Sequence, residues 1–513
     1  MSFVLPISAA LSALLLVLSF PKFDLFFLAP VAFAPFFCAL LKRRGRSFRE
    51  GWIGEALSAF LLCFLWYTGC VWWISYVTLA GMLALCAFIA FLFALFILGA
   101  MFLLRKGYPM APALALGYLF FELTVSYLFT GFPWLALGYA FYDRPVLIQA
   151  ADIFGPHFLS FALVFVSGAV AELAVGEKKT RFVPLAASAL LWLAIALYGS
   201  FMIRSLGKEK PLKTFRASMV QLNLPPELKH DETRDEQTLK DYMEATRAAA
   251  GKADIVLWPE TGVPGIYNDY ANPAVDKLRA FRREVKTPVL CGLTWAEKDN
   301  GGKINFFNAA ALLDNSAMLP QERYYKKHLV IFGEYVPLER FLPFLHLLTP
   351  ISGSYSPGER SHVLNLKKDR ETVKLGALIC FEDVFPSLAR EAAEEGAEVL
   401  VNITNDGWFF DSPGPYQHAA LARFRAVENR KELLRSSNTG VTALVDRLGR
   451  EKGRFIVDGK SVMVGGTFDC EAEVFPSRKT FYTAWGDKSV ALLGIVALLV
   501  FALPAFAGKD MVK

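Results

Sequence analysis

Long apolar stretches fill most of the first 204 positions of the chain and recur once near its end. Each is long enough to cross a bilayer as a helix, which needs roughly 20 mostly apolar residues. Seven such spans lie at about 3–20, 24–41, 55–73, 77–104, 110–129, 157–175 and 183–203, and an eighth at about 489–508. The pattern predicts a multi-pass α-helical membrane domain of about eight transmembrane helices that flank one large polar region.

Within the polar region, short apolar runs alternate with amphipathic stretches, which indicates strands and helices in turn. Strands are expected at 215–221, 253–258, 288–293, 373–379 and 398–404, helices at 233–251, 272–286, 387–395 and 415–434, and hairpins near 304–325 and 440–470. This order predicts an α/β layered sheet domain. The expected organisation is a seven-helix domain at 1–204, a linker at 205–214, an α/β domain at 215–472, a linker at 473–488 and the last helix at 489–508.

Composition and charge support the membrane assignment and orient the chain. Of the 513 residues, 54% are hydrophobic and 45 are Phe, more than a soluble core requires. Basic clusters follow the second, fourth and sixth spans: Lys42, Arg43, Arg44, Arg46 and Arg49; Arg105 and Lys106; and Lys178, Lys179 and Arg181. Because basic loops stay in the cytoplasm, we expect both termini there and the polar region on the opposite face. The first span lacks a basic leader, so we expect it to be a membrane helix and not a cleaved signal peptide.

The candidate chemistry centres on Cys380, which closes the apolar run 373–379. Pro386 suits the first turn of a following helix and Gly396 lies just past its end, so the thiol is expected in a sharp, exposed turn between strand and helix. Glu260 ends another strand, and Lys326 follows the first hairpin. A carboxylate, an ammonium and a thiol in this order could form a thiol enzyme.

Each of these residues also has a simpler interpretation. Cys380 could fill a core, Glu260 could be a loop carboxylate, and Lys326 beside Lys327 could be part of a solvated charge pair. The functional interpretation is favoured because all three end or follow strands of one domain, where open α/β sheets carry their sites.

Cysteine usage is compatible with a free thiol. Four cysteines (Cys38, Cys63, Cys70 and Cys86) lie in apolar spans, which leaves Cys291, Cys380 and Cys470 in the polar region, an odd number that cannot all pair. The histidines of the polar region show no ligand spacing, and there is no CxxC motif or phosphate loop. We therefore expect no metal and no cofactor, and the net charge of +6 without a recognisable motif gives no reason to expect nucleic acid.

These residues carry a family resemblance. The segments Trp258–Thr261, Tyr324–Leu329 and Ile379–Asp383 resemble the carbon-nitrogen hydrolase (nitrilase) superfamily, whose fold is an α-β-β-α sandwich. Nearly the whole chain resembles its membrane-embedded branch, the apolipoprotein N-acyltransferase family. The stretches specific to that branch are Gly131–Trp134 with Gly138 and Gln149, Val220–Asn223, His328–Pro337, Asn402–Phe409, Arg425–Arg430 and Arg435–Gly440.

The resemblance implies a ping-pong acyl transfer without a cofactor. Glu260 would be the base, Cys380 the nucleophile that carries a thioester, and Lys326 the group that stabilises the oxyanion, with Glu334 and Glu382 in support. The implied partners are a phospholipid acyl donor, a diacylglyceryl-cysteine apolipoprotein acceptor and the lipid bilayer. The implied location is the bacterial inner membrane, with the catalytic domain in the periplasm. The reaction is the last step of lipoprotein maturation.

Candidate substrate contacts are aromatic or depart from the family pattern. His230 stands where the family often has Trp, and Phe381 where many members have Tyr. Trp408 and the segment 335–348, which begins with Tyr335, could form lids that meet the bilayer, although core packing is an alternative for 341–348. In the membrane part, Glu122 is notable because an intramembrane carboxylate is usually paired or functional.

Two other functions remain open at this stage. A membrane-anchored carbon-nitrogen hydrolase (amidase) would use the same three residues but release the acyl group to water. A transporter with a docked sensing domain is the third possibility, which the scarcity of charged residues in the spans disfavours.

Overall fold

The computed structural model describes residues 3–45, 47–177, 181–225, 232–269, 272–314, 320–337, 354–359, 363–368 and 370–507, with the backbone alone at 48–50, 232 and 500–507. The chain divides into two compact units. One comprises Met1–Gly207 with Trp485–Lys513, and the other Lys208–Ala484. His230 and residues 338–348 of the expected lid lie outside the described residues.

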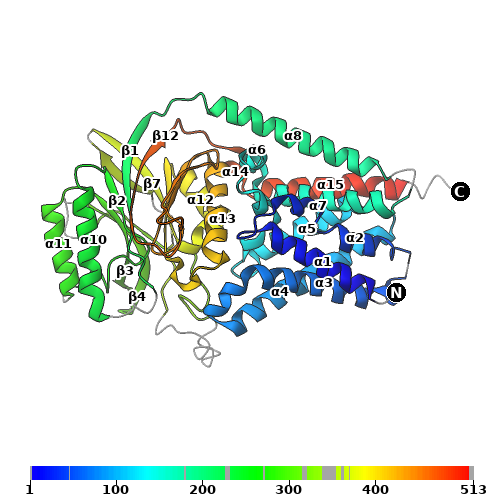
Figure 1. The fold of residues 1–513 in the computed structure, drawn as a ribbon, viewed down its shortest axis with the longest axis horizontal. Coiled ribbons are helices and arrows are strands. Elements are labelled where there is room, and N and C mark those ends of the chain that lie inside the picture. The colour runs from blue at the N-terminus through cyan, green and yellow to red at the C-terminus, as the bar shows by residue number, and fades with distance from the viewer. Residues whose placement is uncertain are drawn as a thin grey trace. The chain divides into compact units, whose positions relative to one another are not determined.

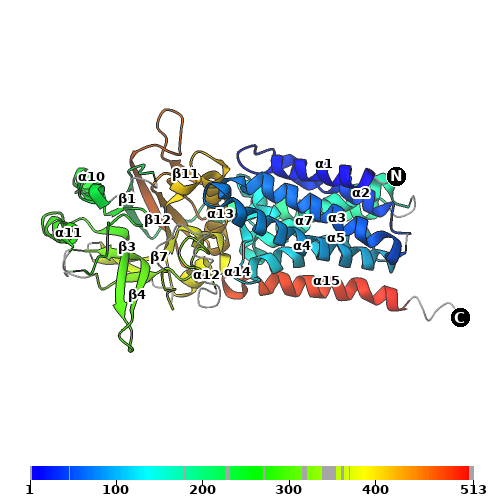
Figure 2. The same cartoon turned by 90° about the horizontal axis from the view of Figure 1, so that it is seen from below.

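The first unit is built of apolar helices that run alongside one another (Figure 2). Among the described residues, five helical stretches are long and apolar enough to cross a membrane: Gly51–Tyr76 (α3 Phe48–Val71 with η2 Trp72–Tyr76), α4 Leu79–Arg105, α5 Met110–Tyr127, α7 Ala151–Val175 and α8 Val183–Leu206. Shorter apolar helices are α1 Val4–Ser19, α2 Ala34–Leu41 and α15, Lys488–Ala507. The apolar helical domain is confirmed, while the count of eight spans stays a prediction.

Two expected spans differ in form from the prediction. The stretch 24–41 is not one helix, because a 3₁₀-helix, η1 Phe26–Val31, precedes α2 and contains Pro30. The stretch expected to begin at 157 begins earlier, at Ala151, and is kinked at Gly155, whose φ is +69°. Only a residue without Cβ adopts this conformation at little cost, and the kink directly precedes Pro156.

Glu122, on α5, has partners that the sequence did not reveal. Its Oε1 accepts a hydrogen bond from the backbone N–H of Leu137 at 2.7 Å, and its Oε2 lies 2.8 Å from Nδ1 of His157 on α7. Both side chains are almost completely buried. The pair joins two helices, so a structural role accounts for the cost of burying this carboxylate.

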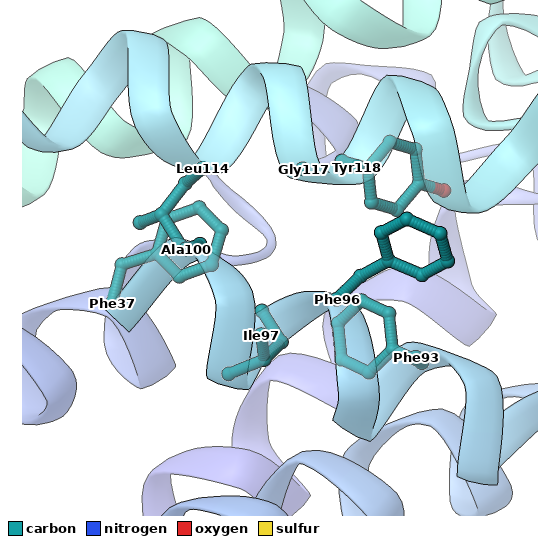
Figure 3. A pocket seen from close by; sticks show the side chains of 8 residues that line it. All are labelled: Phe37, Phe93, Phe96, Ile97, Ala100, Leu114, Gly117 and Tyr118. Atoms are coloured by element: carbon teal, nitrogen blue, oxygen red, sulfur yellow. The ribbon is translucent and has the colours of Figure 1, made fainter. Parts of the chain in front are cut away.

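A narrow crevice between α2, α4 and α5 is lined only by apolar and aromatic groups (Figure 3). Its lining residues are Phe37, Phe93, Phe96, Ile97, Ala100, Leu114, Gly117 and Tyr118. The gap does not admit a water molecule, so it is a packing feature and not a binding site.

The second unit contains two six-stranded sheets (Figure 1). The first has the order β12 Gly466–Val474, β1 Lys213–Gln221, β2 Ile255–Leu257, β3 Val289–Lys298, β4 Ile304–Leu313 and β5 Arg323–Tyr325. The second has the order β11 Glu451–Arg454, β10 Ala443–Val445, β9 Glu432–Ser437, β8 Val399–Thr404, β7 Glu371–Ile379 and β6 Val363–Lys368. The central strands of each sheet are parallel and the outer ones antiparallel.

The sheets pack face to face, and helices cover their outer faces. Figure 1 shows α10 Asp235–Ala249 and α11 Pro273–Glu284 on the first sheet, and α12 Pro386–Glu394 and α13 Pro413–Asn429 on the second. Along β7, Val373, Leu375, Ala377 and Ile379 alternate into the core between the sheets. Each fully buried aliphatic side chain contributes about 1.5–3 kcal/mol of transfer free energy. The predicted α-β-β-α sandwich is confirmed.

Three element predictions in this unit were wrong in part. The helix expected at 415–434 ends at Asn429, where Arg430 turns left-handed with a φ of +52°, and β9 begins at Glu432. The edge strand β6 was not predicted. The last hairpin is formed by β10 and β11 alone, because β12 pairs with β1 in the other sheet.

Candidate active site

The three residues singled out in the sequence follow three different strands. Glu260 follows β2, Lys326 follows β5 and Cys380 follows β7. Gly292 on β3 makes the position of Glu260 possible, because a Cβ there would lie 2.6 Å from the Cα of Glu260 and 2.5 Å from the backbone nitrogen of Thr261. The first sheet thus holds the carboxylate by close backbone packing.

Lys326 lies between two buried carboxylates. Its Nζ is 3.1 Å from Oε1 of Glu260 and 2.9 Å from Oε2 of Glu334, and its side chain is 1% exposed. Nδ2 of Asn308 on β4 donates to Oε1 of Glu260 at 2.8 Å and to Oε1 of Glu334 at 2.7 Å. The alternative of a solvated lysine is therefore excluded for Lys326.

The electrostatics of this cluster keep Lys326 charged. Burial alone would lower the pKa of its ammonium, but the charges of Glu260 and Glu334 outweigh burial and raise that pKa well above its usual value. Further hydrogen bonds orient the carboxylates, from the backbone N–H of Asn405 to Glu260 at 3.1 Å and from that of Val330 to Glu334 at 2.8 Å.

Cys380 opens a short 3₁₀-helix, η7 Cys380–Val384, between β7 and α12. The predicted sequence of strand, sharp turn and helix is confirmed, and the φ of Cys380 is +52°, a strained value for a residue with a side chain. The predicted exposure is wrong, because the residue is only partly accessible and packs against the core between the sheets. Burial and the charge of Glu260 raise the pKa of the thiol, and Lys326 partly offsets them. The resting sulfur is therefore protonated and needs a base.

Glu382 connects the turn of Cys380 to the loop of Lys326. Its Oε1 accepts hydrogen bonds from the hydroxyl of Tyr324 at 2.6 Å and from the backbone N–H groups of Lys327 at 2.7 Å and His328 at 3.1 Å. Its Oε2 accepts from the backbone N–H of Ile379 at 2.8 Å. Burial raises the pKa of this carboxyl to about 7. Glu382 thus holds the segments that carry the thiol and the ammonium.

Three of the four candidate substrate contacts lie in the described residues. Tyr335 follows Glu334 directly and is half-buried, and Trp408 on η8 (Asp406–Phe409) is 36% exposed. Phe381 packs edge-on against Phe385, with ring centroids 5.0 Å apart. Their contact with substrate stays a prediction, as does that of His230.

Sequence reasoning missed several polar residues that bind the candidate groups. Asn308 bridges the two carboxylates, and Nδ2 of Asn402 donates to the backbone oxygen of Cys380 at 3.1 Å. Asn402 lay in a recognised motif, whereas Asn308 had no signal beyond its place in an apolar strand. All seven cysteines are free. The arrangement has what an acyl transfer needs, namely a protonated thiol, a carboxylate to take its proton and a fixed cation for an oxyanion.

Comparison with known families agrees with this geometry. The carbon-nitrogen hydrolase family matches residues 216–468, and the family described as apolipoprotein N-acyltransferase N-terminal domain matches residues 12–169. The apolipoprotein N-acyltransferase of Geobacter metallireducens is 34% identical over 508 residues, which covers 96% of this chain and 94% of the relative. That of Chlorobaculum tepidum is 30% identical over 531 residues, covering 97% and 96%.

Solved structures of the nitrilase superfamily are similar to part of the chain at a lower level. Nit3 of Saccharomyces cerevisiae, a member of branch 10 of that superfamily, has 21% sequence identity and a TM-score of 0.37, and the match covers 51% of this chain and 91% of Nit3. An amidase from Nesterenkonia sp. has 19% identity and a TM-score of 0.35, with 52% and 91% covered.

Proposed function

This chain belongs to the apolipoprotein N-acyltransferase family, and we propose that it transfers an acyl chain from a phospholipid to the α-amine of a diacylglyceryl-modified N-terminal cysteine. The observation that carries the proposal is the buried set of Glu260, Lys326 and Cys380 at strand ends of the carbon-nitrogen hydrolase domain. The step would be the last of bacterial lipoprotein maturation.

In the first half-reaction, Glu260 takes the proton of Cys380, and the thiolate attacks the ester carbonyl of the phospholipid. The carbonyl electrons move to oxygen, where the Lys326 ammonium stabilises the charge, an effect commonly worth about 10²–10³ in rate. The ester C–O bond then breaks, and the leaving alkoxide takes the proton from Glu260. A lysophospholipid departs and Cys380 carries a thioester.

In the second half-reaction, the α-amine of the lipid-modified cysteine attacks the thioester carbonyl. Glu260 accepts the proton of the amine, the C–S bond breaks, and the sulfur takes that proton back from Glu260. The products are an amide and the free thiol. Because a thioester is a higher-energy acyl donor than an amide, the transfer needs no nucleotide.

The helical unit favours this reaction over the alternative of an amidase that releases the acyl group to water. The family match does not stop at the catalytic domain but includes the N-terminal domain characteristic of the acyltransferases. One span would suffice to anchor a hydrolase, whereas the described residues contain five helices of membrane-spanning length. Both proposed substrates carry acyl chains and reside in the bilayer.

We further propose that eight spans place the catalytic unit on the periplasmic side of the inner membrane, with both termini in the cytoplasm. Ion pairs between the basic loops support the placement of these loops on the same face of the membrane. Arg105 at the end of α4 is 2.7 Å from Glu55, which also lies 3.7 Å from Arg43, and Arg44 is 2.7 Å from Glu177 beyond α7. Reporter fusions after residues 45, 106 and 208 test this, because the first two should report cytoplasm and the third periplasm.

The activity is tested with purified protein in detergent and a phospholipid labelled in its acyl chains. We expect a label on the protein that hydroxylamine removes and that is absent from Cys380→Ala. Addition of a diacylglyceryl-cysteine peptide should move the label to the peptide amine and free the thiol.

The outcomes separate the alternatives. Release of the label as free fatty acid at the same rate with and without peptide would identify a hydrolase. No label from any phospholipid, in protein that retains its fold, would refute the assignment of the acyl donor.

A further inference from the structure

A buried cluster of four charged side chains is connected to Cys380 through the turn η7 and through Asn402. Asp383 belongs to η7, Asp406 to η8, His418 to α13 and Arg435 to β9. All four side chains are at most 1% exposed. None of them has a part in the acyl transfer proposed above.

The ring of His418 is held between the two carboxylates. Its Nε2 is 2.7 Å from Oδ1 of Asp383, and its Nδ1 is 2.8 Å from Oδ1 of Asp406. A neutral imidazole has a proton on only one nitrogen, so the other would present a lone pair to a carboxylate oxygen. The Nδ1 contact is a hydrogen bond, and the Nε2 contact has the distance of an ion pair without hydrogen-bond alignment, so both are favourable together only when the ring is protonated.

Arg435 completes the cluster and balances its charge. Its Nη1 is 2.5 Å from Oδ2 of Asp383, and its Nη2 is 3.0 Å from Oδ2 of Asp406. Two carboxylates thus face one guanidinium and one imidazolium. If His418 lost its proton, the buried cluster would carry one uncompensated negative charge, which burial makes costly.

The cluster is connected directly to the nucleophile. Asp383 and Cys380 share the single turn η7, so a fixed Asp383 fixes the turn that holds Cys380 at its positive φ of +52°. Nη1 of Arg435 also donates to Oδ1 of Asn402 at 2.8 Å, and Nδ2 of Asn402 donates to the backbone oxygen of Cys380 at 3.1 Å. The strained backbone of Cys380 is therefore held from two directions by the same cluster.

We propose that protonated His418 is a positioning residue, which clamps η7 so that the thiol of Cys380 is held for attack, and that loss of its proton sets the alkaline limit of thioester formation. This inference rests on the proposed function, because thioester formation is the step it controls. It assigns His418 no contact with substrate.

The direction of the pH effect follows from the groups around the ring. Burial lowers the pKa of His418, but Asp383 and Asp406 outweigh burial and the opposing Arg435, so that the pKa is raised to about 8. Nearby Arg425, which donates from α13 to the backbone oxygen of Asp383 at 3.1 Å, stays charged, as does Arg435. Between pH 7 and pH 9 the clamp is therefore lost as pH rises.

Titration of the Cys380 thiol or of the Lys326 ammonium does not explain a fall in rate in this pH range. The pKa of the Cys380 thiol is raised, so the sulfur is still protonated at pH 9 and passes its proton to Glu260 within the site, a transfer that does not depend on pH. The pKa of Lys326 lies well above its usual value, so this ammonium keeps its charge to far higher pH. Glu382, whose carboxyl pKa is about 7, becomes ionised as pH rises and then accepts its hydrogen bonds more strongly, so its titration does not lower the rate either. A fall in rate between pH 7 and pH 9 is thus the signature of His418.

The test measures the rate at which acyl-labelled phospholipid acylates Cys380 in the full chain, from pH 6.5 to pH 9.5. We expect the wild-type rate to fall about tenfold from pH 7 to pH 9, as expected for a single group with a pKa near 8. In His418→Gln the rate at pH 7 should be about 10–100 times lower and should no longer fall with pH. Asp406→Asn, which keeps the histidine but removes one carboxylate, should move the decline to lower pH.

A matched control is His157→Gln in the helical unit, where His157 is also buried against a carboxylate. This variant should keep the alkaline decline. A second readout does not depend on activity: the ring resonances of labelled histidines, assigned with His418→Gln, should show His418 protonated at pH 7. A wild-type decline that persists unchanged in His418→Gln, or a neutral His418 ring at pH 7, would overturn the inference. Wild-type protein that forms no thioester at pH 7 would instead refute the proposed function.

Discussion

Removal of the Lys326 ammonium tests the electrostatic design of the site most directly. In Lys326→Met, Glu260 and Glu334 stay buried but lose the cation that lies 3.1 Å and 2.9 Å from them. Breaking a buried ion pair in this way costs about 3–5 kcal/mol, because an uncompensated charge is left behind. For a domain of this size, that loss corresponds to a fall in Tm on the order of 10 °C.

The rate should fall as well, for a separate reason. Without the ammonium, the oxyanion of the tetrahedral intermediate loses its fixed cation, and thioester formation should slow by about 10²–10³. The two effects can be separated with the double variant Lys326→Met/Glu334→Gln, which removes one of the two facing negative charges. Its unfolding free energy should recover by about 1–2 kcal/mol relative to Lys326→Met. The recovery is partial because a Gln amide cannot accept hydrogen bonds from both Asn308 and the backbone of Val330, as Glu334 does.

The assay combines thermal unfolding of the detergent-solubilised chain, followed by tryptophan fluorescence, with the rate of label transfer to Cys380. Glu334→Gln alone is the matched control. The reasoning would be refuted by a Lys326→Met variant as stable as the wild type, or by a double variant that regains the rate of thioester formation together with its stability.

Three further predictions follow from single contacts. Gly292→Ala should lower the acylation rate at least tenfold, because the added methyl group overlaps the backbone of Glu260. Acylation at the wild-type rate would contradict this. Glu382→Gln should lower the Tm by several degrees. The amide nitrogen would face one of the backbone N–H groups that donate hydrogen bonds to this carboxylate, and the unsatisfied donor costs about 1–3 kcal/mol of stability. Glu122→Gln should lower the thermal stability of the helical unit in detergent, because the amide lacks one of the two oxygens that contact the backbone N–H of Leu137 and the ring of His157, and unchanged thermal stability would contradict this.

The parts of the fold that the sequence predicted are those with an apolar signal. The run before Cys380 is a buried central strand, β8 likewise consists largely of apolar residues, and in β1 the apolar Phe215, Ala217 and Met219 alternate with Arg216 and Ser218. Pro386 and the glycine at 396 set the limits of α12 closely, because a proline fits the first turn and a glycine ends the last.

The strand β9 was not predicted because its buried charged residues interrupt the apolar pattern that indicates a strand. Its sequence, Glu432–Ser437, lacks apolar alternation, and the helix predicted at 415–434 includes its first three residues. In the fold, Arg435 pairs with Asp383 and Asp406, and Glu432 with Lys452 at 3.1 Å. A charged residue can be buried in a central strand only when partners from distant segments neutralise it, and a single sequence does not show such partners. The same holds for the site, where strand ends revealed the catalytic candidates but not the side chains that orient them.

The two charged clusters connected to Cys380 have different consequences for the reaction. In the first, two carboxylates and one ammonium leave one net negative charge, carried by Glu260, Glu334 and Lys326. That charge opposes an idle thiolate, which protects the thiol until substrate arrives. During the reaction the negative charge moves from Glu260 to sulfur and then to the oxyanion beside Lys326, but its amount does not change, so the buried site need not accept a new charge. In the second cluster, Asp383 and Asp406 are neutralised by Arg435 and by His418, by the latter only while it keeps its proton. Loss of that proton leaves a buried negative charge on the elements that hold Cys380, which is why the protonation of a histidine that contacts no substrate should control the rate.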